Sequence, residues 1–309
     1  MPVSVLRPPA PAAGVVAGSS AMAYHRMARP WVTAWWRPPL AVAVALVLVV
    51  TTMAVAAVVG RSLPSLPVLG GNTALAWSFA GIAAALPLVL LTVRWVERRP
   101  AGTVSSVVGR LRWRWLAVCL AAATPIAALS LLVGVVGVAA SAAAPPSDAG
   151  PSWVGIGPYL GTLAVVGALM IGQVATEEYL SRGVLMQSIG WFFRSPWPGI
   201  TIQAALFAAL HGVGTAAGLA ATFTIGVALG WLTVRTGGLE AGIAFHLAYN
   251  GTILLVAAAV SDNDPAANLA GAPWQLAAAQ AIGALAYTSV TRVLAAVAPA
   301  ALFPPHPTA

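Results

Sequence analysis

The sequence predicts an all-α, polytopic membrane protein with about eight transmembrane helices. Of its 309 residues, 60% are hydrophobic and only 7% are charged, whereas about a quarter of the residues of a soluble domain are charged. Its apolar runs approach or exceed the roughly 20 residues that a helix needs to cross the hydrocarbon core. All fifteen basic residues are arginine, and most lie in connections between these runs. The net charge of +8 therefore reflects membrane topology rather than nucleic-acid binding.

Eight apolar segments are expected to cross the bilayer, and two have soft boundaries. The fifth is short, and the fourth continues past a group of charged residues. In chain order they are 40–59, 75–94, 115–139, 158–176 with a continuation, 198–213, 216–234, 240–260 and 274–298.

Four regions organise the chain around these spans. Residues 1–38 are a cytoplasmic tail, disordered up to a Trp- and Arg-rich patch, and 39–150 hold the first three spans. Residues 151–262 form a core of four spans, and 263–309 hold the last span and a C-terminal tail. A Pro-, Ser- and Gly-rich external loop, 143–157, is the best internal boundary.

The arginines orient the spans in the membrane. Twelve lie on one side: four in the tail, six from Arg94 to Arg114, then Arg194 and Arg235. The opposite side carries Arg61 and all three aspartates. The positive-inside rule places both termini in the cytoplasm. The absence of lysine, together with abundant Ala, Val and Gly, indicates GC-rich coding and favours a bacterial plasma membrane.

Three polar motifs interrupt the apolar sequence of the core. An ionisable group inside a bilayer costs roughly 2.5–3.5 kcal/mol on insertion scales, so such groups mark functional sites by default. The motifs are Glu177-Glu178-x-x-x-Arg182, Phe207-x-x-x-His211 and His246-x-x-x-Asn250.

The first motif predicts two glutamates with different roles. Glu178 and Arg182 are four residues apart and share a helical face, so they can form an ion pair. Glu177 points about 100° away and is free to face a cavity. A purely structural ion pair between helices is the alternative for this motif alone.

The two histidine motifs indicate a functional site only in combination with the first motif. A single membrane histidine is more often a helix–helix contact than a catalyst, but His211, His246 and Asn250 all lie at depths similar to that of Glu177. They can meet in one cavity that opens toward the cytoplasm, provided that the fourth helix continues to about Ile189.

Other intramembrane chemistries lack their signatures here. There is no His-Glu-x-x-His zinc motif. No Gly-x-Ser-Gly precedes a partner histidine, which excludes a serine–histidine dyad. All three aspartates lie in loops, which excludes an intramembrane aspartyl dyad. Cys119 is the only cysteine, so the single chain can form no disulfide.

The order of these motifs resembles the CPBP family, the CAAX-type intramembrane proteases and their bacterial relatives. Arg235-Thr-Gly-Gly-Leu-Glu-Ala-Gly-Ile-Ala-Phe-His246 is also similar to the turn and helix that precede the third motif in that family. The resemblance covers roughly residues 155–258. It implies that Glu177 and His211 activate water, and that His246 and Asn250 stabilise the oxyanion of a tetrahedral intermediate.

The resemblance leaves the role of a metal open. Family members are described both as metalloproteases and as metal-free glutamate proteases. A zinc ion would be held by Glu177, His211 and His246, but no pair has the tight local spacing of a strong metal motif. We favour metal-free water activation. Glu178, Arg182 and Phe207 would then support the site.

The expected function is an intramembrane endopeptidase acting on a membrane-associated or lipidated peptide or protein. Its partners are this substrate and the lipid bilayer, not nucleic acid. Two alternatives remain at this point: a non-catalytic membrane scaffold or immunity protein, and a proton-coupled transporter in which Glu177 and the histidines relay protons.

Overall fold

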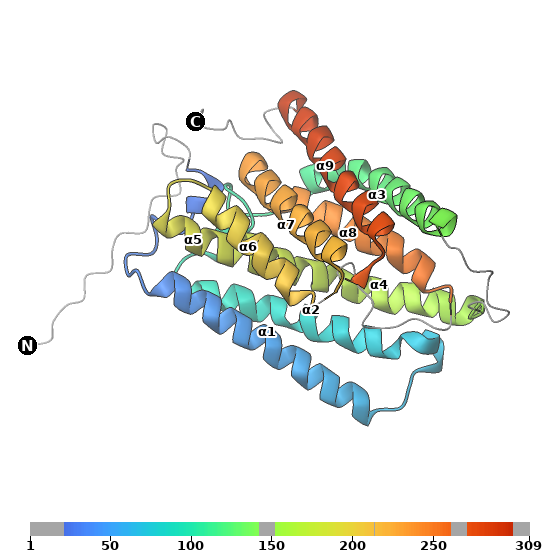
Figure 1. Cartoon of the computed structure of the whole chain (residues 1–309). Helices are drawn as coiled ribbons and strands as arrows, with labels where there is room; N and C mark the ends of the chain where they lie inside the picture. Colours follow the sequence, from blue (N-terminus) through green and yellow to red (C-terminus); the bar gives the residue numbers. More distant parts are fainter. Residues whose placement is uncertain (1–21, 142–151, 213, 261–270, 299–309) are drawn as a thin grey trace, which may run out of the picture.

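The computed structural model describes residues 22–141, 152–212, 214–260 and 271–298, and the regular elements within these ranges are all helices. The protein is therefore an all-α membrane protein, as the composition predicts (Figure 1). The main helices are α1 (Arg37–Ser62), α2 (Thr73–Trp95), α3 (Trp113–Ser141), α4 (Ile156–Glu178), α5 (Met186–Phe192), α6 (Trp197–Leu210), α7 (Ala216–Thr236), α8 (Glu240–Ala257) and α9 (Trp274–Val297). Four short turns are η1 (Tyr24–Arg26), η2 (Pro67–Asn72), η3 (Ala101–Val104) and the π-helix η4 (Tyr179–Leu185).

Seven of these helical runs are long and apolar enough to cross a bilayer, and the eighth segment, α6, is shorter. The fourth run is continuous from Ile156 to Phe192, because η4 joins α4 to α5 without a break. The predicted continuation of the fourth helix is thus confirmed. With 14 residues, α6 is about 21 Å long, which is less than the roughly 30 Å of a bilayer core.

Helix α4 lies at the centre of the bundle, between α2 and α8 (Figure 1). Helix α1 packs on α2, α3 packs on both α8 and α9, and α7 lies between α9 and α6. Small residues allow the closest of these approaches, as expected for membrane helices. A Cβ at Gly81 would lie 2.9 Å from the Cα of Met53, and one at Gly172 would lie 2.7 Å from the Cβ of Ala83.

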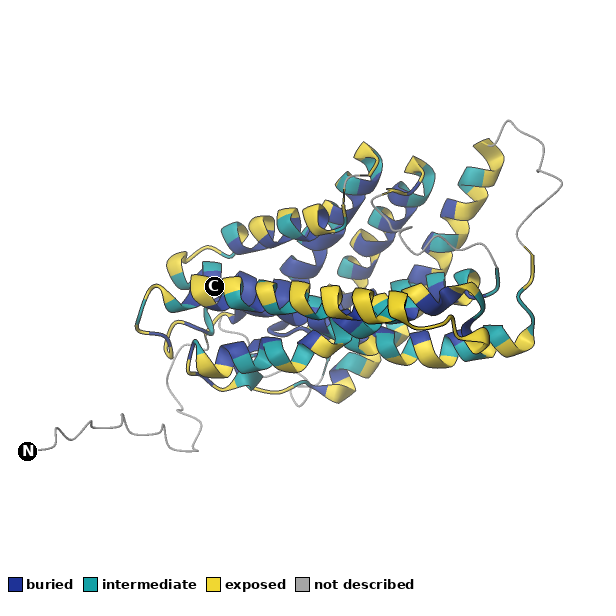
Figure 2. Ribbon diagram, turned by 90° about the horizontal axis from the view of Figure 1, so that it is seen from below, coloured by how far each residue is buried: buried dark blue, intermediate teal, exposed yellow. Residues whose placement is uncertain are grey.

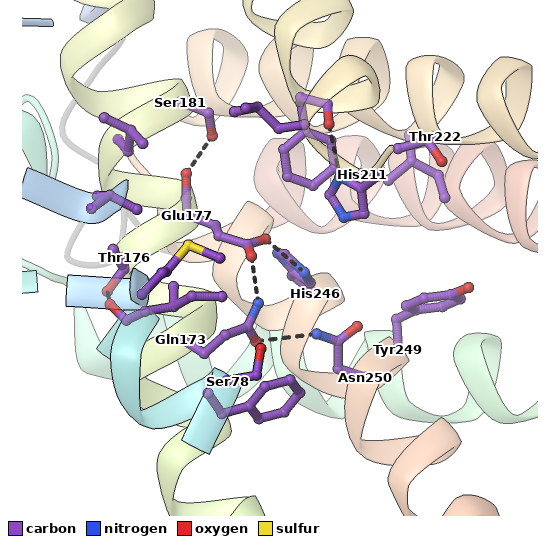
Figure 3. Close-up of a pocket in the computed structure, with 18 of the residues that line it drawn as sticks. Ser78, Gln173, Thr176, Glu177, Ser181, His211, Thr222, His246, Tyr249 and Asn250 are labelled. Atoms are coloured by element: carbon purple, nitrogen blue, oxygen red, sulfur yellow. Dashed lines mark hydrogen bonds and ion pairs between the residues drawn. The ribbon is translucent and has the colours of Figure 1, made fainter. Parts of the chain in front are cut away.

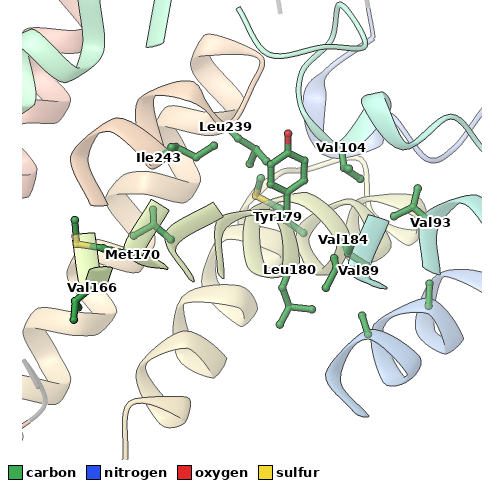
Figure 4. Close-up of a cluster of buried hydrophobic side chains, with 14 of the residues drawn as sticks. Val89, Val93, Val104, Val166, Met170, Tyr179, Leu180, Val184, Leu239 and Ile243 are labelled. Atoms are coloured by element: carbon green, nitrogen blue, oxygen red, sulfur yellow. The ribbon is translucent and has the colours of Figure 1, made fainter. Parts of the chain in front are cut away.

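Two clusters of buried apolar side chains hold the bundle together. The larger one surrounds α4 and η4, where Met170, Leu180 and Val184 meet side chains of α2 and α8 (Figure 4). The second joins α3, α8 and α9 around Trp115, Phe245 and other residues. Exposed apolar residues follow the outer faces of the helices (Figure 2), as expected where lipid replaces water.

The arginine-rich connection between α2 and α3 is folded against the start of α8. Arg112 binds Glu240 through two side-chain hydrogen bonds of 3.0 and 2.7 Å. Arg99 binds Glu97 at 2.8 Å, and both side chains are buried. Burial raises the pKa of Glu97, and the neighbouring guanidinium of Arg99 offsets part of that effect. The arginines of this loop therefore do more than orient the chain, because two of them form its buried ion pairs.

Residues 22–36 are ordered, whereas the sequence predicts disorder as far as residue 30. Tyr24, His25 and Ala28 are buried. His25 Nε2 lies 2.9 Å from the carbonyl of Arg194, and Arg29 donates to the carbonyl of Trp191 at 2.9 Å. The segment is held by the end of α5, which local sequence does not reveal. The rest of the predicted tail, 1–21, lies outside the described residues, as do most of the loop 143–157, the three aspartates and residues 299–309.

Candidate active site

The first motif lies where α4 passes into the π-helix η4. Glu177 and Glu178 end α4, and all seven residues of η4 are buried. The hydroxyl of Ser181 donates to the carbonyl of Glu177, and bonds of this kind often bend helices. Single π-turns inside α-helices are rare and occur frequently at functional sites.

Glu178 is fully buried and holds two basic groups. Its Oε1 accepts from Arg182 Nη1 at 2.8 Å, so the predicted ion pair is confirmed. The same oxygen lies 3.0 Å from Nδ1 of His246 on α8, a contact that spacing alone does not predict. Gly242 makes room for this carboxylate, since a Cβ there would lie 2.7 Å from Glu178 Oε2.

Glu177 turns toward a cavity, as its position on the helix predicts. Its side chain is 22% exposed, whereas that of Glu178 is 0% exposed. Oε1 accepts from Nε2 of Gln173 at 2.6 Å, and Oε2 lies 3.7 Å from Nε2 of His246 (Figure 3). A separation of 3.7 Å is too long for a direct hydrogen bond, so Oε2 is a buried atom without a hydrogen-bond partner.

The ring of His246 is oriented by its contact with Glu178. A carboxylate can only accept, so Nδ1 carries the proton of this hydrogen bond. The other nitrogen, Nε2, then faces Glu177. A histidine whose second nitrogen is held by a buried carboxylate has a defined tautomer and a defined ring plane.

Phe207 links the arginine of the first motif to both histidines. The Arg182 guanidinium lies over the Phe207 ring, 4.3 Å from its centroid. The same ring lies 4.5 Å from the ring of His211 and 6.0 Å from that of His246. The aromatic residue of the second motif thus covers a buried charge and packs against both imidazoles.

His211 directly follows the last residue of α6, Leu210. Its Nδ1 lies 2.7 Å from the carbonyl of Phe207. Because a carbonyl only accepts, Nδ1 carries the proton in this bond, and in the neutral ring Nε2 is an acceptor. The ring points into the same cavity as Glu177 and His246 (Figure 3).

Asn250 completes the predicted set through a residue that sequence reasoning missed. Its Nδ2 donates to Oε1 of Gln173 at 3.4 Å, one turn of α8 beyond His246. Gln173 therefore contacts both Glu177 and Asn250. A signal was available in the sequence, because Gln173 lies four residues before Glu177 on the same helical face.

One cavity of about 980 Å³ brings these groups together. Glu177, His211, His246 and Asn250 all line it, with Gln173, Thr222 and Tyr249 among its other polar residues. Apolar side chains of α1, α2, α6, α7 and α8 form most of the remaining wall. The site is thus a small polar cluster in a largely apolar chamber.

The site residues are not arranged as a metal-ligand set. Across the described part of the chain, no three His, Cys, Asp or Glu side chains are grouped closely enough to hold a metal ion. The zinc set anticipated from the resemblance, Glu177, His211 and His246, is therefore not preassembled.

Residues 159–252 match the family model for type II CAAX prenyl endopeptidase, Rce1-like. The chain carries an Rce1-like domain. This domain covers α4 to α8 almost completely and contains all three polar motifs. The match is consistent with the CPBP family that the motifs indicate, and it supports a CAAX-type intramembrane protease in general. No curated protein and no solved structure matches the chain.

Proposed function

We propose that this protein is an intramembrane endopeptidase that hydrolyses a peptide bond of a membrane-associated or lipidated substrate by metal-free activation of water. Glu177 and His211 would activate the water, and His246 and Asn250 would stabilise the oxyanion. The observation that carries the proposal is the convergence of these four side chains, from three separate helical segments, on one cavity within an Rce1-like domain.

Glu177 suits the role of general base. It is the more exposed of the two glutamates of the first motif and lines the cavity, and its Oε2 has no hydrogen-bond partner. A candidate base must lie within reach of the proton that it removes, directly or through one water. His211 lines the same cavity, and its ring is held by the hydrogen bond from Nδ1 to the Phe207 carbonyl.

His246 and Asn250 suit the stabilisation of negative charge. An oxyanion needs donors that are held in place before the reaction begins. Asn250 supplies an amide N–H group, and His246 supplies Nε2 once that atom carries a proton. The proton that Glu177 takes from water must reach the leaving amine. Oε2 lies 3.7 Å from His246 Nε2 and is placed to pass the proton through this imidazole, which donates to the oxyanion while it carries the proton and then gives it to the amine.

The deciding experiment compares the detergent-purified protein with its Glu177→Gln variant on a library of membrane peptides, with and without a strong chelator. The amide keeps the shape of the carboxylate but not its basicity, so we expect cleavage to fall below detection while protein level is unchanged. Glu97→Gln is the control for the loss of a buried charge outside the cavity: it breaks the pair with Arg99 and should lower protein level, but cleavage per folded molecule should stay at the wild-type value.

Four outcomes decide the proposal. Loss of cleavage in Glu177→Gln together with survival in chelator supports it. Full activity of Glu177→Gln would show that the general base is assigned wrongly. Loss of cleavage in chelator, restored by added zinc, would show that the reaction depends on a metal. An intact wild-type protein that binds membrane peptides but cuts none would favour the scaffold.

A further inference from the structure

Gln173 is a buried polar residue of the cavity to which no motif assigns a role. It lies on α4, one turn before Glu177, and is 5% exposed. Both ends of its amide are occupied by residues of the proposed catalytic set. Nε2 donates to Glu177 at 2.6 Å, and Oε1 accepts from Asn250 at 3.4 Å (Figure 3).

The charge of Glu177 sets the direction of this chain of hydrogen bonds. An ionised carboxylate has no proton to give, so Gln173 must present its NH2 group to it. The oxygen of the Gln173 amide then faces Asn250 and can only accept. Asn250 must in turn present its NH2 group to Gln173, and the second N–H of that group remains available to the cavity.

The same chain holds Asn250 in the orientation that its proposed role requires. If the Asn250 amide were rotated by half a turn, its oxygen would face the oxygen of Gln173, and the two acceptors would repel each other. An acceptor in place of the N–H group would destabilise an oxyanion. Preorganised donors matter because small errors in position or orientation greatly reduce the rate of catalysis.

We propose that Gln173 is a positioning residue that transmits the ionised state of Glu177 to Asn250 and thereby holds the asparagine NH2 group as an oxyanion donor. This inference rests on the proposed protease function. Gln173 acts through Asn250 and need not touch the substrate.

A purely structural role predicts a different outcome. Gln173 joins α4 to α8, and such bonds between membrane helices contribute to stability. If that were its only role, a substitution would lower protein level or thermal stability, and the remaining folded protein would turn over normally. Kinetics normalised to folded protein separate the two roles.

The test uses the full-length protein and four variants, with kcat and KM measured on a cleaved peptide. Gln173→Met keeps the length of the side chain and removes both polar groups. Asn250→Ala removes the proposed donor, and the double variant combines the two changes. Gln280→Met is the matched control, since Gln280 is fully buried in α9 and is absent from the cavity wall.

We expect Gln173→Met to lower kcat by roughly 10- to 100-fold with KM changed by less than about twofold, as for an interaction made only in the transition state. Adding Gln173→Met to Asn250→Ala should change kcat little, because the first variant acts through the second residue. Gln280→Met should keep the wild-type kcat. If Gln173→Met does not accumulate, Gln173→Glu keeps size and polarity and should lower kcat further, because an acceptor then faces Glu177.

The inference is overturned if kcat of Gln173→Met stays near that of the wild type, if only KM changes, or if the losses of the two single variants multiply. Failure of the protease proposal looks different: either the wild-type protein cuts nothing, or Glu177→Gln remains active. If Glu177→Gln is inactive and Gln173→Met is fully active, the protease proposal stands and only the role assigned to Gln173 is wrong.

Discussion

At the scale of single residues, the two adjacent glutamates differ in burial, and this difference separates their proposed roles. Glu178 has no exposed surface and lies between Arg182 and His246, so its charge is balanced and its position is determined. Glu177 has access to the cavity and leaves one oxygen without a partner. In the proposed mechanism, the buried Glu178 is therefore the support and the accessible Glu177 the reactive group.

Arg182→Ala is expected to lower the amount of folded protein. Glu178 would keep its charge without its main partner, and removal of one member of a buried pair typically costs about 3–5 kcal/mol. Membrane level and thermal unfolding in detergent measure the effect. Arg114→Ala removes an exposed arginine instead and should change neither quantity by a comparable amount; equal effects of the two variants would contradict the role of the ion pair.

Sequence reasoning predicted four residues that line one cavity, but not all of their contacts. The i, i+4 spacing predicts Glu178 with Arg182 and Phe207 with His211, because both pairs are local on helices. The contact of Glu178 with His246 joins residues 68 positions apart. Such a contact depends on how α4 and α8 pack, and local sequence patterns carry no information about that.

At the scale of elements, the N-terminal segment is attached to the helix that carries the first motif. The backbone of η1 approaches α5 so closely that a Cβ at Gly190 would lie 1.8 Å from the carbonyl oxygen of His25. Trp191 adds a hydrogen bond from its ring nitrogen to the Val32 carbonyl at 2.8 Å and stacks with Arg29, whose guanidinium lies 4.4 Å from the ring centroid.

Gly190→Ala should therefore release residues 22–36 from α5. The added methyl group overlaps backbone atoms, which cannot move aside as a flexible side chain would. Hydrogen–deuterium exchange should become faster in this segment and stay unchanged in α8. Gly157→Ala is the control, because nothing lies within 4 Å of its added Cβ, and unchanged exchange in Gly190→Ala would show that the contact is not tight.

Acidification should loosen the same segment through His25. Burial lowers the pKa of this histidine from 6.5, and the nearby charge of Arg26 acts in the same direction. Protonation would also place a hydrogen on Nδ1, a buried atom without a partner. The detached segment therefore binds a proton more readily than the packed one. The packing is fully stable above about pH 6.5 and weakens as the pH falls from there toward the lowered pKa.

Exchange rates of residues 22–36 measured from pH 7.5 to pH 5, after correction for the intrinsic pH dependence of exchange, provide the test. His25→Gln cannot take up the proton, so the corrected rates of that variant should no longer depend on pH in this window. An equal response of the variant and the wild type would assign the pH effect to another group.

Helix α6 and the turn after it show why a short span suits this site. Its roughly 21 Å length ends at Leu210, within the thickness of the bilayer core. Non-helical backbone at that depth is tolerated where it lines a cavity or is covered by protein. His211 follows immediately and lines the cavity, so the early end of α6 places an imidazole inside the chamber.

At the scale of the whole molecule, the cavity depends on helices outside the Rce1-like domain. Val42, Leu46 and Met53 of α1 and Ser78 of α2 belong to its wall. Spans of nearly uniform hydrophobicity predict that α1 and α2 cross the membrane, and these predictions agree with the helices closely. They do not predict which face of each helix meets a neighbour, because an apolar residue is equally stable against lipid and against protein.

The topology of the bundle yields the last prediction. The rule that arginines remain on the cytoplasmic side places Arg98 and Arg235 inside and Arg61 outside, and all three are exposed on the protein. Cys119 is buried, so Cys119→Ala provides a background without cysteine. Single substitutions Arg61→Cys, Arg98→Cys and Arg235→Cys then report the side of each connection through a membrane-impermeant thiol reagent.

In intact cells, only Arg61→Cys should be labelled; the other two variants should react after the membrane is made permeable. Because α6 is too short to span a full bilayer on its own, Arg235 is the critical position. Protection of the Arg235→Cys variant from the reagent in intact cells would show that α6 and α7 together enter from the cytoplasmic side and return to it, with His211 between them. Labelling of Arg235→Cys in intact cells would mean that the segment from α6 to α7 crosses the membrane an odd number of times, and would require a different path into the site for the substrate.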